Sequence, residues 1–145
     1  EAVLAAAATL PAQLLEPAAS GRLAHGDWHL GQLVHSDAGW RLIDVDDLGQ
    51  DDPAWDLARP AAWYAAGLMP LTAWRRFLTA YSDAGGPAFA PGADPWPVLE
   101  PFARAMVVQT AARLLAKATR VTCPWERTMV DACHRIAAMP SGEPS

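Results

Sequence analysis

Lysine is nearly absent from this sequence, and long apolar runs are absent altogether. Lys117 is the only lysine among 145 residues, the ten arginines are scattered, and the net charge is −5. Because no basic stripe is available to meet phosphates, the composition argues against a nucleic-acid partner. No segment reaches the ~18 consecutive apolar residues of a membrane span, and the first residues lack the basic region of a signal peptide. We therefore expect neither a nucleic acid nor a membrane as partner.

Cysteine is also scarce, with only Cys123 and Cys133, ten residues apart. Two reduced cysteines in a cytosolic protein are a commoner arrangement than a disulfide in a chain of this kind, so we expect a cytoplasmic location. Apolar residues make up 52% of the chain and charged residues 19%, which is typical of a globular protein and not of a disordered one. The high alanine content suggests a GC-rich bacterial genome, and the end, 140–145, predicts a disordered tail.

The pattern along the chain predicts a small β region followed by helices. Residues 2–16 are rich in helix formers, with Pro11 as a break or kink. Strands are expected at 22–24, 32–35 and 40–45, the last two forming a hairpin whose outer ends bring Gln32 close to Asp44. Helices are expected at 53–66, 70–84, 95–118 and 124–138, with N-terminal signals at Asp52-Pro53, Asp94-Pro95 and Cys123-Pro124-Trp125-Glu126. The predicted fold class is therefore α+β, mostly α.

Two stretches carry residues suited to chemistry: "HGDWHLGQ", from His25 to Gln32, and "IDVDDLGQDDPAWD", from Ile43 to Asp56. The second holds six aspartates and no basic residue, and carboxylates so close together need a cation, backbone donors or open solvent. The predicted hairpin gathers Asp27, Gln32 and Asp44. One carboxylate can take a proton from a hydroxyl, while a second carboxylate and an amide carbonyl are oxygen ligands suited to Mg²⁺. Phosphoryl transfer needs this set of groups.

The same residues resemble the aminoglycoside phosphotransferase and choline kinase-like family, whose pattern is H-G-D-x-H-x-x-N, then I-D-[FWV]-[DE], then G-D-P-x-x-D-L-A. The resemblance covers about 23–58 and implies an ATP-dependent, Mg²⁺-dependent kinase folded like the C-terminal lobe of a protein kinase. It implies that Asp27 receives or orients the substrate hydroxyl, and that Asp44 is the main magnesium ligand. Asp56 would be a buried anchor that holds the catalytic loop by hydrogen bonds.

On this resemblance, residues 1–139 form the lobe, with three parts: the catalytic loop 25–32, the metal-binding segment 43–47 and the helical subdomain 53–139. Gln32 would be a metal ligand and, with His29 and Asp44, would contact the nucleotide, while Asp46 would assist the metal. Because no segment upstream of His25 can hold a phosphate-covering loop and its lysine, we expect the nucleotide-binding N-terminal lobe to be absent. This chain alone should therefore be inactive or incomplete, with self-association or a separate N-terminal lobe as the expected partner.

The sequence departs from the family pattern at two positions. Gln32 stands where the family has asparagine, as in maltokinase-like members, which favours a sugar slightly, and the glycine of the G-D-P element is displaced to Gly49. The acceptor, a hydroxyl of an aminoglycoside, a sugar or an amino alcohol, stays open, although the acidic balance weakly suits a cation. Two other functions also stay open: a non-catalytic kinase-like binding domain, and a metal-dependent hydrolase using His25-x-Asp27-x-His29.

Overall fold

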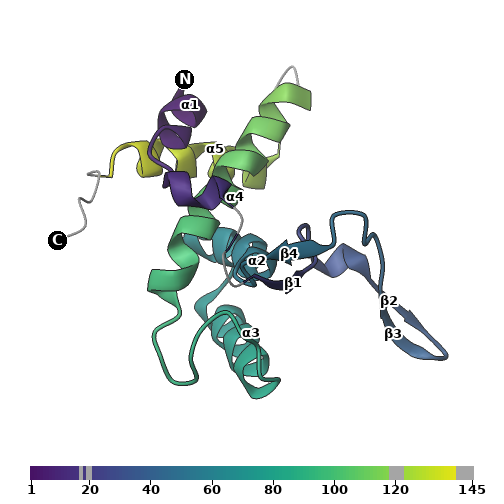
Figure 1. The fold of residues 1–145 in the computed structure, drawn as a ribbon. Coiled ribbons are helices and arrows are strands. Elements are labelled where there is room, and N and C mark those ends of the chain that lie inside the picture. Colours follow the sequence, from purple (N-terminus) through teal and green to yellow (C-terminus); the bar gives the residue numbers. More distant parts are fainter. Residues whose placement is uncertain (17, 19–20, 118–122, 140–145) are drawn as a thin grey trace.

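A computed structural model describes residues 1–16, 18, 21–117 and 123–139 (Figure 1). Over these residues the chain is α+β and mostly helical, as the sequence predicts. In chain order the elements are α1 (Ala2–Ala7), η1 (Ala12–Leu15), β1 (Arg22–Ala24), η2 (Leu30–Gln32), β2 (Leu33–Ser36), β3 (Gly39–Leu42), β4 (Gly49–Asp51), α2 (Trp55–Ala65), α3 (Leu71–Asp83), α4 (Trp96–Lys117) and α5 (Pro124–Ala137). The tail at 140–145 lies outside the described residues.

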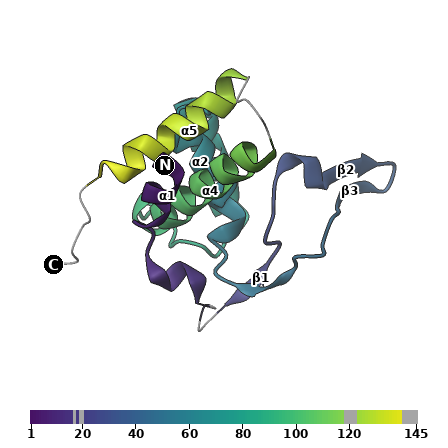
Figure 2. The same ribbon diagram turned by 90° about the horizontal axis from the view of Figure 1, so that it is seen from above.

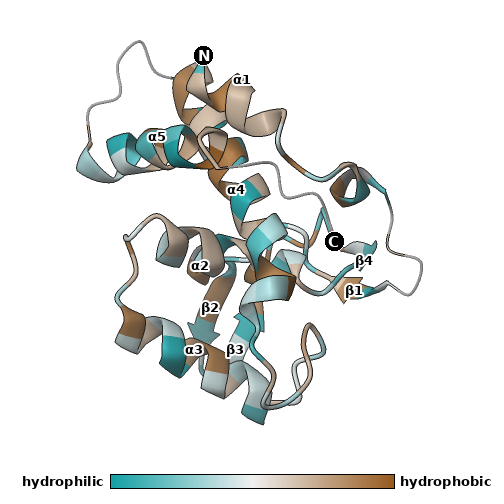
Figure 3. Ribbon diagram, turned by 90° about the vertical axis from the view of Figure 1, so that its left-hand side faces the viewer, coloured by the Kyte–Doolittle hydropathy of each residue, from teal (hydrophilic) through white to brown (hydrophobic). Residues whose placement is uncertain are grey.

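The helices α1, α2, α4 and α5 enclose the main apolar core. Helix α4 contacts α2, α5 and α1, and contributes Met106, Val107 and Ala111, which pack with Met129 and Cys133 of α5. A second cluster lies between α2, α3 and α4. Figure 3 shows hydrophilic and hydrophobic residues alternating along α3 and α5, as expected for helices that bury one face.

The N-terminal segment breaks near Pro11 as predicted, but α1 is shorter than expected. It ends at Ala7, and the 3-10 turn η1 follows Pro11. The hydroxyl of Thr9 donates to the carbonyl of Ala6 at 2.8 Å, and the carbonyl of Thr9 accepts a bond from Arg104 at 3.1 Å. The N–H groups of Thr9 and Leu10 bond to the carbonyls of Ala6 and Ala7, three residues back, and Pro11 has no N–H to continue the helix. The segment 2–16 therefore leaves the α-helix before Pro11, earlier than predicted.

The strands form two antiparallel pairs, β2 with β3 and β1 with β4. The predicted hairpin is confirmed, with Leu33 opposite Leu42, but the strand predicted at 40–45 ends at Leu42. Strand β4 was not predicted, because "GQD" holds no β-branched or aromatic residue; it forms by pairing Gly49 with Ala24. Figures 1 and 2 both show the β2–β3 hairpin projecting away from the helices.

The later helices lie within a few residues of their predicted bounds, and their N-terminal signals act largely as expected. The backbone N–H of Trp96 donates to Asp94 at 3.0 Å, and that of Cys123 donates to Glu126 at 2.9 Å. Asp52 is not the N-cap of α2: its carboxylate accepts a bond from the N–H of Ala54 at 2.9 Å, in the turn that precedes the helix.

Two further expectations concern membrane spans and cysteines. Within the described ranges, no helix combines the length and apolarity needed to cross a membrane. Cys123 is exposed and Cys133 buried, and both are free thiols.

Candidate active site

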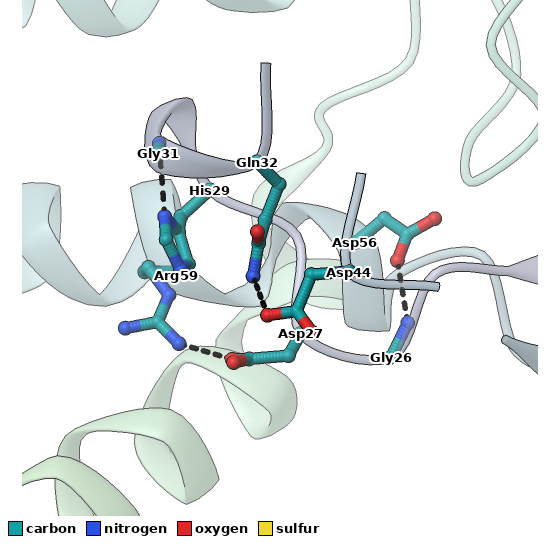
Figure 4. Close-up of polar contacts among 8 residues, drawn as sticks. All are labelled: Gly26, Asp27, His29, Gly31, Gln32, Asp44, Asp56 and Arg59. Atoms are coloured by element: carbon teal, nitrogen blue, oxygen red, sulfur yellow. Dashed lines mark hydrogen bonds and ion pairs between the residues drawn. The ribbon is translucent and has the colours of Figure 1, made fainter. Parts of the chain in front are cut away.

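The loop 25–32 is held at its start by α2. The carboxylate of Asp56, in the first turn of α2, accepts bonds from the backbone N–H of His25 at 2.9 and 3.0 Å. It also accepts a bond from the N–H of Gly26 at 3.2 Å (Figure 4). Asp56 is half-buried, and not fully buried as expected. The hydrogen-bonding anchor implied by the family pattern is therefore confirmed in its contacts.

One helical turn further along α2, Arg59 contacts the proposed catalytic residue. Its guanidinium forms an ion pair with the carboxylate of Asp27, and both side chains are partly exposed. Residues three apart lie on one face of a helix, so Asp56 and Arg59 hold neighbouring parts of the same loop (Figure 4). Arg59 was not predicted as a site residue; its spacing from Asp56 on a predicted helix was the available signal.

The segment 43–47 packs against the start of this loop. The ring of His25, only 2% exposed, donates from Nε2 to the carbonyl of Ile43 at 3.0 Å. Gly26 has φ +84°, and a Cβ there would lie 2.8 Å from the carbonyl oxygen of Asp47. Two stretches separated by the whole β2–β3 hairpin therefore meet at close range, and His25 serves to hold them together.

Gln32 and Asp44 are joined directly, as the hairpin predicts. Nε2 of Gln32 donates to Oδ2 of Asp44 at 2.7 Å, and the backbone carbonyl of Gln32 accepts from the N–H of Ile43 at 2.9 Å. Gln32 is 5% exposed, so burial holds the stem of its side chain in place, whereas Asp44 is exposed. Asp44 has φ +59°, a left-handed conformation that aspartate tolerates better than most residues.

These oxygen donors fit a magnesium ion better than a zinc ion. Mg²⁺ is commonly held by one or two carboxylates together with phosphate oxygens and water, and no arginine or lysine pairs with Asp44 in the part of the chain described. Turning the Gln32 amide by 180° would place its oxygen beside the Asp44 carboxylate, an arrangement that a cation between them would favour. Asp46 is exposed. No group of three or more His, Cys, Asp or Glu among the described residues could hold a metal by itself.

His29 lies where the loop meets a pocket. Its Nδ1 accepts a bond from the N–H of Gly31 at 3.0 Å, so the imidazole is oriented by its own turn. A pocket of about 490 Å³ opens beside it, with Arg59 also in its lining. Arg59, the ion-pair partner of Asp27, therefore lines a cavity large enough for a small molecule.

A comparison with protein families places these residues in context. The model of a family described as "Phosphotransferase enzyme family" matches residues 1–102, which include the loop 25–32, the segment 43–47 and all of α2. Neither the comparison with curated proteins nor that with solved structures gave a match. The match covers 102 of the 145 residues, and this chain therefore belongs to the phosphotransferase enzyme family.

Proposed function

We propose that the chain forms the acceptor and metal side of an ATP-dependent kinase that phosphorylates a hydroxyl of a small molecule, such as an aminoglycoside, a sugar or an amino alcohol. One observation carries the proposal: the hydrogen bonds of His25 and Gln32 to the segment 43–47 bring a fixed Asp27 and the Gln32–Asp44 pair into one region. A base and hard oxygen ligands within reach of each other are what phosphoryl transfer asks of a protein.

Asp27 would act on the acceptor. Its carboxylate takes the proton of the hydroxyl as a bond forms between the acceptor oxygen and the γ-phosphorus. The bond from the γ-phosphorus to the β–γ bridging oxygen breaks, and ADP leaves. Arg59 fixes the direction of this carboxylate through the ion pair, which places the base before substrate arrives and so removes part of the cost of orientation.

The ligands for Mg²⁺ would be Asp44, the amide oxygen of Gln32 and, in support, Asp46. When bound, the ion neutralises charge on the phosphates. The role of this chain is to present the oxygens: burial holds the Gln32 stem in place, while rotation of its terminal amide exchanges the N–H donor seen in the structure for a carbonyl oxygen. His29, oriented by Gly31, would contact the nucleotide from the same loop.

The nucleotide-covering side would come from a separate lobe or from a second copy. Several apolar side chains on and beside the hairpin are exposed: Leu23, Val34, Trp40, Leu42, Ile43, Val45 and Leu48. A concentration of this kind is typical of a surface that docks another protein segment. Ile43 and Val45 belong to the segment 43–47, so a lobe docked there would lie close to the proposed metal ligands.

A non-catalytic kinase-like binding domain is the second candidate, and the Gln32–Asp44 bond favours it, because the amide satisfies the carboxylate without any cation. The hydrolase alternative has less support, since the imidazoles of His25 and His29 both bond to backbone groups. Titration with nucleotide and metal ions separates the three candidate functions. A kinase binds nucleotide together with Mg²⁺, a hydrolase binds Zn²⁺ stoichiometrically, and a non-catalytic binding domain binds neither.

The kinase proposal is tested with the Asp27→Asn variant of the enzyme that includes the nucleotide-covering side. ADP release is measured with Mg²⁺, ATP and a panel of aminoglycosides, sugars and amino alcohols. A general base contributes about 10²–10⁴-fold, so kcat should fall by that factor with little change in KM. Asp37→Asn, at an exposed aspartate in the hairpin turn, is the matched control. A near-normal kcat in Asp27→Asn removes this residue from the catalytic role.

A further inference from the structure

The pocket beside the Asp27–Arg59 pair has an apolar lining. Ten residues line it, and none is an aspartate or a glutamate. Most are apolar: Trp28, Leu30, Pro60, Trp63, Leu68, Met69 and Pro70. Its volume of about 490 Å³ falls in the range of small-molecule sites, which are mostly apolar with a few polar groups that fix orientation. Here the polar groups are His29 and Arg59.

Other aromatic rings pack against the two tryptophans of the lining. The ring of Trp28 packs on Phe77 of α3, with centroids 6.1 Å apart, and that of Trp63 packs on Trp125 of α5, at 5.4 Å. The backbone N–H groups of Leu68 and Met69 both donate to the carbonyl of Trp63, at 2.8 and 3.1 Å. The loop after α2 is thereby tied to the same tryptophan. A pocket whose walls are already packed loses little freedom when it binds a ligand.

The charges around the pocket disfavour a cationic acceptor. Arg59 lines the pocket and brings a positively charged guanidinium to it. The carboxylate of Asp27 lies next to the Arg59 guanidinium but is already paired with it. A ligand carrying several ammonium groups would meet a fixed positive charge and an apolar wall, and burial of a charge without a partner is costly.

We infer that the acceptor is a neutral hydroxyl compound with an apolar or aromatic ring face, and not a polycationic aminosugar. Its ring face rests on the apolar lining, and its hydroxyl lies at the Arg59 end of the pocket, next to the Asp27 carboxylate. This inference rests on the proposed kinase function, and it names the substrate class of the same site. The acidic balance of the whole chain, which weakly favours a cation, is outweighed by the composition of this one cavity.

Calorimetric titration of the chain, without nucleotide, tests the inference with three probes: 2-(2-naphthyl)ethanol, kanamycin and maltose. The informative variant is Leu30→Gln, because Leu30 lines the pocket and is 77% exposed, so its replacement should leave the fold intact. The matched control is Leu4→Gln in α1, at a leucine 76% exposed and outside the pocket lining. Loss of one leucine contact should weaken binding by roughly tenfold.

The expected result is that naphthylethanol binds more tightly than kanamycin or maltose, and that Leu30→Gln weakens it roughly tenfold while Leu4→Gln has no effect. Tighter binding of kanamycin or maltose, no binding of naphthylethanol, or equal effects of the two leucine variants would each overturn the inference. Because this measurement needs no phosphoryl transfer, failure of the kinase assay with ring-alcohol binding intact counts against the proposed function alone. Kinase activity with kanamycin as the preferred acceptor counts against the inference alone.

Discussion

Replacing Asp56 by alanine should destabilise the fold by releasing the loop 25–32. The carboxylate accepts the backbone N–H groups of His25 and Gly26. His25 is 2% exposed, so its N–H would find no water, and an unpaired buried donor costs about 1–3 kcal/mol. The N–H of Gly26 lies at an exposed residue and can bond to water, so it adds little. We therefore expect the free energy of unfolding to fall by about 2 kcal/mol, or the melting temperature by about 4–8 °C.

Thermal unfolding of Asp56→Ala and Asp56→Asn, followed by circular dichroism, measures this loss. Asparagine keeps one acceptor oxygen and should retain part of the stability. The control is Asp131→Ala, at an exposed aspartate within α5. Amide hydrogen exchange at His25 gives the local signal, because this N–H loses its partner. Melting of Asp56→Ala at the temperature of the unchanged protein would refute the anchoring role.

Three further predictions concern packing and burial. Gly26→Ala should destabilise the chain more than Gly39→Ala, although both glycines have positive φ (+84° and +95°). A Cβ added at Gly26 meets the carbonyl of Asp47, whereas one added at Gly39 meets nothing within 4 Å. Equal urea midpoints for the two variants would contradict this contact. Burial raises the pKa of the Cys133 thiol, so a thiol reagent should label Cys123 alone in the native protein, and rapid labelling of both would contradict this. Because the unfolded thiol ionises at lower pH than the folded one, stability should also fall as pH rises above the ordinary cysteine pKa.

The helices could be predicted from the sequence because their signals are local. Apolar periodicity and residues that bond to the first backbone N–H groups, such as Asp94 and Glu126, give bounds close to those of α3, α4 and α5. The pairing of Gln32 with Asp44 was also predictable, since a hairpin with a "DAG" turn fixes which residues face each other at its open end.

The strand ends and the ion pair depend on tertiary contacts, which the sequence does not reveal. The strand predicted to reach Val45 stops at Leu42, because the carbonyl of Ile43 bonds to His25 and Asp44 turns into the left-handed region. Arg59 was missed for a similar reason: helical spacing places it beside Asp56, but nothing in the sequence indicates which loop carboxylate it would contact.

Paramagnetic broadening by Mn²⁺ tests the central claim most directly. Mn²⁺ takes the same oxygen ligands as Mg²⁺, and ¹⁵N-labelled chain can be titrated with it in the presence of ATP, which makes the measurement independent of turnover. We expect the amide signals of 25–32 and 43–47, including the side-chain NH₂ of Gln32, to broaden first, and the effect to be lost in Asp44→Asn but kept in the exposed control Asp37→Asn. Broadening centred elsewhere, or unchanged in Asp44→Asn, would contradict a metal site formed by Gln32 and Asp44.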